Sequence, residues 1–193
     1  MRSITCKLFM LLFAVALFLP ATASAQIPLT GVQSVGLSAN LPESLTISLT
    51  GASSVTFNPL LPAGVTAGIP SVGVQTTWVL NPSRGSVKLV GYFSSVHALT
   101  EPTGPSYIDV ANVLGKLTGG TGSTTVFTPF TGTVTGGIGI AGASLLLFEE
   151  SISGTNKNRN RIDTLDLEID LTSVPQQPAG AYTGTLNIQA IVL

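Results

Sequence analysis

The chain of 193 residues contains a single cysteine, Cys6, and a single histidine, His97. Ordinary zinc sites are built from several cysteine and histidine ligands, so this composition nearly excludes one. An intramolecular disulfide needs two cysteines and is excluded as well. Nucleophilic catalysis would depend on pairing His97 with a serine, and no G-x-S-x-G nucleophile turn is present.

Charge and long hydrophobic runs are also scarce. Charged residues make up 9% of the chain and the net charge is −1. Nucleic-acid binding calls for clustered Lys and Arg, so such a partner is not expected. After residue 25 no stretch approaches the 18 apolar residues of a spanning helix, and no membrane span is expected there. Neither glycine-rich nucleotide-binding pattern is present, and no cofactor is expected.

The first 25 residues have the pattern of a secretory signal peptide. Arg2 and Lys7 give a cationic start, residues 8–19 are continuously apolar, and Pro20 ends the run. Residues 23–25 supply the small-x-small pattern that signal peptidase accepts. The apolar run would be about 18 Å long as a helix, which is too short for a retained anchor.

Cleavage is expected between Ala25 and Gln26, so the protein is predicted to be secreted, periplasmic or on the cell surface of a bacterium. Removal of residues 1–25 takes away Cys6. It also takes away Arg2 and Lys7, which leaves six basic and nine acidic residues, a net charge near −3.

The remaining chain favours β-structure, because Thr, Val, Gly and Pro are abundant and apolar residues alternate with polar ones. We predict an all-β fold: an immunoglobulin-like antiparallel β-sandwich of about seven to nine strands over residues 43–193. Residues 26–42 are expected to form a first strand or an extended arm. Strands are expected at residues 45–50, 72–80, 86–95, 124–135, 144–153, 162–172 and 182–193.

Three connections are less regular. Residues 81–85 have turn chemistry and predict a hairpin between the second and third strands. Residues 107–117 mix the periods of a strand and a helix, so both remain open. Residues 115–142 are rich in glycine and favour long hairpin loops.

The C-terminal segment 178–188, PAGAYTGTLNI, resembles the close of secreted bacterial β-sandwich proteins. These are chaperone–usher pilin subunits, spore-coat-U-like proteins and WxL cell-wall-binding domains. Residues 78–80 also spell W-x-L. The resemblance implies a pilin-like architecture in which Tyr182 packs at a corner of the sandwich, and it implies no activity.

Few residues are candidates for chemistry. His97 is expected at a strand end, facing solvent. Asp166, Glu168 and Asp170 alternate along one strand and are expected to form a solvated face, because their spacing of about 6.6–7 Å is long for chelation by one strand. No catalytic or metal-binding residue is assigned.

Possible ligand contacts are Trp78, Tyr92, Arg159 and Arg161. Both arginines lie in the basic segment 156–161, which we predict to be a hairpin loop that contacts an anion or glycan or is a plain polar turn. Trp78 and Tyr92 can stack on sugars, although core packing is the expected role of Trp78.

Two functions of different classes follow. The first is a non-catalytic, fimbrial-like structural or adhesive subunit at the cell surface, in which residues 26–40 complete a like subunit by strand addition. The alternative is a monomeric module that binds cell-wall glycan or other carbohydrate. A third possibility, a secreted hydrolase, rests on His97 and the carboxylates.

Overall fold

A computed structural model describes residues 34–174 and 176–193. The expected signal peptide, with its cleavage point at Ala25 and Gln26, lies outside these residues. The chain divides into two units, Met1–Ala39 and Asn40–Leu193. The described residues of the first unit, 34–39, have no regular secondary structure, and neither do residues 40–43 at the start of the second.

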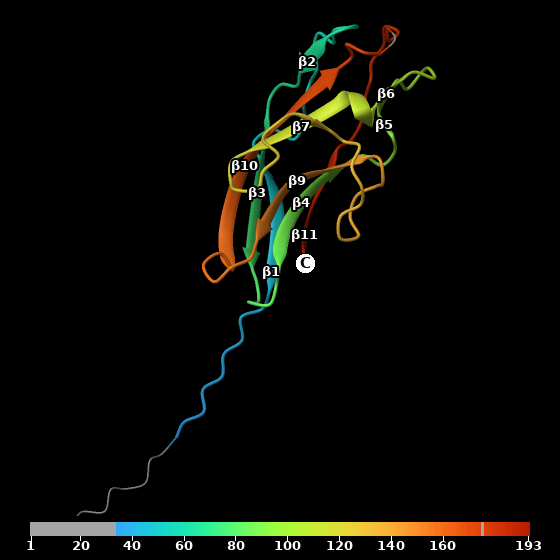
Figure 1. The fold of residues 1–193 in the computed structure, drawn as a ribbon. Coiled ribbons are helices and arrows are strands. Elements are labelled where there is room, and N and C mark those ends of the chain that lie inside the picture. The colour runs from blue at the N-terminus through green and yellow to red at the C-terminus, as the bar shows by residue number, and fades with distance from the viewer. Residues whose placement is uncertain (1–33, 175) are drawn as a thin grey trace, which may run out of the picture. The chain divides into compact units, whose positions relative to one another are not determined.

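Antiparallel β-sheets make up the second unit, which confirms the predicted all-β class (Figure 1). The largest sheet runs in the order β1 (Ser44–Thr50), β3 (Val72–Val79), β10 (Asn158–Asp170), β7 (Val113–Thr118) and β8 (Thr128–Pro129), with β2 (Val65–Ala67) also paired to β10. A second sheet has the order β11 (Asn187–Val192), β4 (Ser86–Tyr92) and β9 (Ser144–Ser151). A small third sheet pairs β5 (His97–Thr100) with β6 (Tyr107–Asp109).

The sequence pattern of β3 and β10 determines which face of each strand is buried. In β3, Val74, Thr76 and Trp78 are fully buried while their neighbours are only partly buried. In β10, Leu165 and Ile169 are fully buried, as the alternation of apolar and polar residues predicts. Because alternate residues of a strand point to opposite faces, each of these strands has one buried face.

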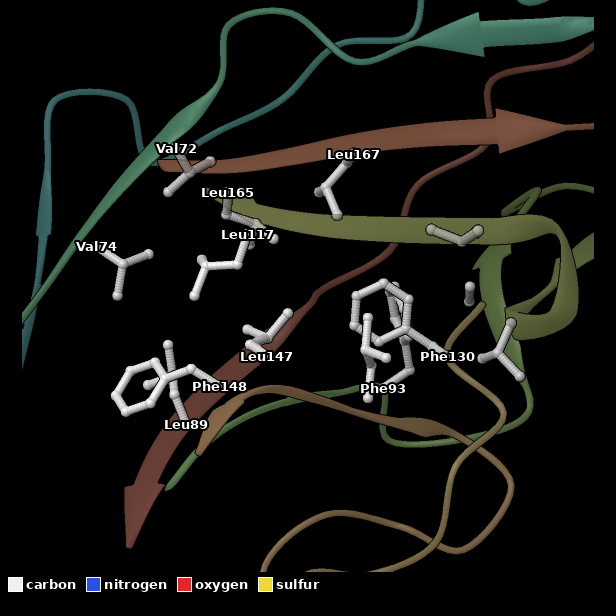
Figure 2. Packing of buried hydrophobic residues seen from close by; sticks show 14 of the residues in the cluster. Val72, Val74, Leu89, Phe93, Leu117, Phe130, Leu147, Phe148, Leu165 and Leu167 are labelled. Atoms are coloured by element: carbon white, nitrogen blue, oxygen red, sulfur yellow. The ribbon is translucent and has the colours of Figure 1, made fainter. Parts of the chain in front are cut away.

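The two larger sheets pack face to face around one apolar core, so the domain is a β-sandwich. Figure 2 shows side chains from both sheets meeting there, among them Val74 of β3, Leu117 of β7 and Leu89 of β4. Phe130, which follows β8, packs edge-on against Phe93 with ring centroids 5.2 Å apart. The ring of Phe130 is accommodated by Gly115, since a Cβ there would lie 2.9 Å from it.

The hairpin predicted at residues 81–85 is wrong. Strand β3 already pairs with β1 and β10, whereas β4 pairs with β11 and β9. The turn therefore carries the chain from one sheet to the other. Glu43 anchors this turn, because its carboxylate accepts hydrogen bonds from the backbone N–H of Asn81 (2.6 Å) and from the Arg84 side chain (2.7 Å).

Two further expectations are corrected, and residues 107–117, for which strand and helix were both open, are assigned. Residues 124–135 contain only the two-residue strand β8, because their backbone instead covers the edge of the second sheet. Residues 107–117 contain β6, a short 3-10 helix (Val110–Asn112) and most of β7, which explains their mixed period. Eleven strands occur in the described residues, more than the predicted seven to nine, because several have only two to four residues.

The Oγ1 atom of Thr76 is buried in the core and has no hydrogen-bond partner among the described residues. We expect Thr76→Val to raise the free energy of unfolding by about 1 kcal/mol, because an unpaired buried hydroxyl is destabilising. Urea denaturation followed by Trp78 fluorescence measures this. Thr77→Val is the matched control, since Thr77 is on the outer face and donates to Asn160. A loss of stability in Thr76→Val would contradict the assignment.

The pKa of Glu43 is lowered from 4.5 to about 2, chiefly by its hydrogen bond to Arg84 and also by that to Asn81. Because the folded pKa is depressed, the contribution of this group to stability is complete above pH 4.5 and is lost as the pH falls toward 2. NMR titration should give a midpoint near 2 for Glu43, and Arg84→Met should raise it toward 4.5. Lys88→Met, which removes the surface ion pair with Glu149, should leave this midpoint unchanged.

Candidate binding groove

Trp78 lies in the core and does not reach the surface. Its side chain is fully buried, and its Nε1 donates a hydrogen bond to the backbone oxygen of Asn156 at 2.7 Å. The structure thus places Trp78 where core packing was expected, and a sugar cannot stack on it in this fold. Tyr92 is half-buried near the end of β4, and its backbone oxygen faces Asn187 of β11.

The basic segment 156–161 is not a hairpin loop. Residues 158–161 begin β10, which pairs with β3 and β7 and not with the preceding strand β9. Within β10, Arg161 points into the core and Arg159 is partly exposed. The two arginines therefore do not form a surface site for an anion or glycan.

Arg161 belongs to a buried network of charges. Its Nε donates to Asp163 at 2.6 Å and its Nη1 to Glu150 of β9 at 3.1 Å. The guanidinium also lies over the Phe148 ring, 3.9 Å from the centroid. Arg159 contacts the other oxygen of Glu150. Two cations thus neutralise two anions, and the network joins the two sheets.

His97 is placed at the start of β5, as expected for a strand end, and is partly exposed. Its Nδ1 lies 2.9 Å from Asp109, and its ring is 3.7 Å from that of Tyr107. Ser95 is the serine next to it, but the Ser95 Oγ bonds to the backbone N–H and oxygen of His97 and not to the imidazole. Ser95 is therefore not placed as a nucleophile for His97.

Asp166, Glu168 and Asp170 of β10 face outward, as predicted, whereas Asp163 of the same strand is buried. Asp166 pairs with Lys116 at 3.3 Å and accepts from Ser71. The pKa of Glu168 is raised by partial burial and by the nearby Asp170. The pKa of Asp170 is lowered by hydrogen bonds from the side chain and backbone of Thr172. In the part of the chain that the structure describes, no group of three His, Cys, Asp or Glu side chains is placed to hold a metal ion.

An apolar groove with a volume of about 740 Å³ lies between the two sheets. One lip is formed by residues 49–60 and the other by residues 180–188. The floor consists of core side chains, some from strands, such as Val72, Leu165 and Leu167, and some from loops, such as Phe93. We call this feature the edge groove.

The edge groove lies on the open side of the sandwich. Within residues 34–174 and 176–193, strand β1 is the end of the first sheet and β11 is the end of the second, so each has one side to which no described strand is paired. At the opposite side, β7 and β9 are covered by residues 122–144. The Thr124 N–H donates to Leu147, the Glu149 N–H to Gly122, and the Gly132 N–H to Ser144. The side at β7 and β9 is therefore covered by a hydrogen-bonded segment, whereas no described segment covers the side at β1 and β11.

The chemistry of the edge groove is that of a binding surface. Among the residues described along it, Tyr182 alone has a titratable side chain, and no pair of groups is placed for acid–base catalysis. Tyr182 donates its hydroxyl hydrogen bond to the backbone oxygen of Pro178 at 2.9 Å. The groove can therefore bury apolar side chains while the free strand edges offer backbone hydrogen bonds.

Sequence reasoning missed the edge groove because its lining comes from segments that are far apart in the chain. The available signal was the alternation of apolar residues in two segments, with Val55 and Phe57 in the first and Tyr182, Leu186 and Ile188 in the second. No protein-family model, curated protein or solved structure matches the chain. Among the described residues no helix has the length and apolarity to cross a membrane.

We expect Arg161→Met to lower the free energy of unfolding by about 3–5 kcal/mol, because Glu150 and Asp163 would stay buried without their main cation. Arg159→Met is the matched control: this side chain is 38% exposed, and its loss should cost no more than about 1–2 kcal/mol. Urea denaturation of both variants measures the difference. Equal losses would contradict the assignment of Arg161 as the central cation.

Proposed function

We propose that this chain is an exported, non-catalytic, immunoglobulin-like and pilin-like β-sandwich that serves as a structural or adhesive subunit at a bacterial cell surface. In this function it assembles with like subunits by strand addition. The pattern of residues 1–25 supports export, and residues 178–188 support the pilin-like architecture. The observation that carries the proposal is the edge groove beside the open strands β1 and β11.

A free strand edge is a template for another strand, because its N–H and C=O groups have no partner. Proteins usually protect such edges with charges, prolines or a covering segment. Here residues 122–144 cover the β7 and β9 side, whereas β1, with the sequence SLTISLT, has no charge or proline. An added strand at this side would gain backbone hydrogen bonds and an apolar surface together.

The low charge of the chain fits the same function. Among the described residues of the groove Tyr182 alone is titratable, and its hydroxyl is bonded to Pro178. Such a groove recognises a partner by shape and apolar contact. The geometry around His97 supports the non-catalytic part of the proposal, since Ser95 is bonded to the backbone.

Leu49 tests the proposal, because it is the 47% exposed residue of β1 that lines the edge groove. In the full-length chain exported from bacteria, Leu49→Lys should weaken self-association about tenfold or more, since burying a lysine at the interface costs more than about 1.4 kcal/mol. Sedimentation velocity over a range of concentrations measures this.

Thr46→Lys is the matched control, because Thr46 is on the outer face of the same strand. It should assemble as the unmodified chain does. An unmodified chain that stays monomeric at every concentration would overturn the proposed function.

A second candidate function, the monomeric carbohydrate-binding module, is favoured by the outer face of the first sheet. There Asn160 of β10 accepts hydrogen bonds from Gln75 (2.9 Å) and Thr77 (3.2 Å) of β3. Such a flat surface of amides and hydroxyls matches the hydroxyl groups of a glycan. A chain that remains monomeric and sediments with purified cell-wall glycan would support this function in place of the first.

A further inference from the structure

We propose that the β5–β6 hairpin is a clamp that positions one lip of the edge groove, and that this position controls how tightly the groove binds a partner. This rests on the proposed function and adds the regulation of its site. It concerns residues 180–186, which we call the clamped lip, and their contact with β5.

The backbone of the clamped lip is joined to the hairpin at one residue. Thr183 donates its N–H to the Thr100 oxygen at 3.0 Å and accepts from the Thr100 N–H at 2.9 Å. Among the described residues 180–186, Thr183 alone makes backbone-to-backbone hydrogen bonds. The lip is therefore not held by a ladder of bonds along its length, and its contact with β5 determines where it lies.

Gly184 permits a close approach between the lip and β5. A Cβ atom on Gly184 would lie 2.0 Å from the Ala98 oxygen, so a larger residue does not fit at this distance. Ala98 is 3% exposed and belongs to the core, so its backbone is not free to give way. A pair of hydrogen bonds and a close backbone approach thus fix the lip on the same short strand.

The hairpin is itself held at three points. Ile108 of β6 is 1% exposed and packs in the core. At the open end of the hairpin, the His97 Nδ1 lies 2.9 Å from Asp109. At its turn, the Glu101 N–H donates to the Ser106 oxygen at 3.0 Å. The hairpin is therefore the rigid partner of this contact, and the lip is the less constrained one.

The clamp and the groove share side chains. Leu99 of β5 and Ile108 of β6 belong to the groove lining, as do Tyr182 and Leu186 of the lip. If the lip moves away from β5, these two sets of side chains separate and the groove loses its shape. A partner then binds less tightly, because ordering the lip again costs free energy. The clamp thus keeps the groove in a binding-competent shape.

The first test displaces the lip without changing the hairpin. Gly184→Ala places a Cβ against the Ala98 backbone, whereas Gly180→Ala, the matched control, meets side-chain atoms of Glu101, the nearest at 2.8 Å. In the full-length exported chain we expect Gly184→Ala to raise amide hydrogen exchange at Thr183 about tenfold or more and to weaken self-association about fivefold or more. Gly180→Ala should leave both quantities close to those of the unmodified chain. NMR and sedimentation velocity measure them.

A disulfide between Thr100→Cys and Thr183→Cys provides a second test, which stands if Gly184→Ala does not fold. The two residues exchange both backbone hydrogen bonds, and Cα atoms in such pairs are about 5.5 Å apart, within the range of a disulfide. With Cys6 replaced by serine, the oxidised chain should self-associate at least as tightly as its reduced form. Weaker self-association on oxidation would show that the lip must leave β5 for binding, and would overturn the clamp.

The outcomes separate the clamp from the proposed function. If Gly184→Ala leaves the exchange at Thr183 unchanged, or raises it and still assembles normally, the clamp is wrong and the proposed function stands. An unmodified chain that is monomeric at every concentration overturns the proposed function. The clamp is then decided by anilinonaphthalene sulfonate, a dye that binds exposed apolar surface. Its fluorescence should rise in Gly184→Ala and not in Gly180→Ala, and equal fluorescence overturns the clamp.

Discussion

The ion pair between Arg161 of β10 and Glu150 of β9 determines how one side of this sandwich is built. Two buried charges need their remaining hydrogen-bonding groups satisfied, or the burial is strongly unfavourable. The chain meets that requirement with the segment after β7. The Thr121 oxygen and the Ser123 hydroxyl accept from Arg161, and the Gly120 N–H donates to Asp163. Residues 120–124 are thereby held against the edges of β7 and β9. Gly122 permits this approach, because it has φ +75° and a Cβ there would lie 1.9 Å from the Glu149 oxygen.

Among the described residues the opposite side, where the edge groove lies, shows no such network of buried charges. It is lined by Leu49 of β1, by Leu186 just before β11 and by Ile188 of β11, whose apolar side chains need no hydrogen-bond partner in a covering segment. The segment that covers the side at β7 and β9 is thus held by buried charges, whereas the side at β1 and β11 offers apolar side chains. A surface of the second kind can be covered by any strand with a matching apolar face.

The parts of the fold that sequence could predict are those encoded within one strand. The alternation in residues 162–172 predicted the buried and outward faces of β10, because period 2 is a local property. Strand pairing is not local. The turn at residues 81–85 has the same chemistry whether it closes a hairpin or crosses between sheets, so the partners of β3 and β4 could not be inferred. Likewise the polar segment around Arg161 predicts a loop, because the sequence alone does not show that Glu150 and Asp163 are buried beside this arginine. The groove was hidden for the same reason, because its lips are more than a hundred residues apart.

The exposure of the groove has a thermodynamic consequence for a chain with no disulfide. Leu165 and Leu167 line its floor but are buried, so the apolar surface that the groove leaves open to water belongs to its lips, for example at Leu49, which is 47% exposed. Residues 35–41, which lie before β1, carry further exposed apolar side chains at Val35, Leu37 and Leu41. If the edge groove binds another copy, as proposed, association would remove apolar surface from water. The free energy of unfolding would then rise with protein concentration, because binding to the folded state alone stabilises it by mass action.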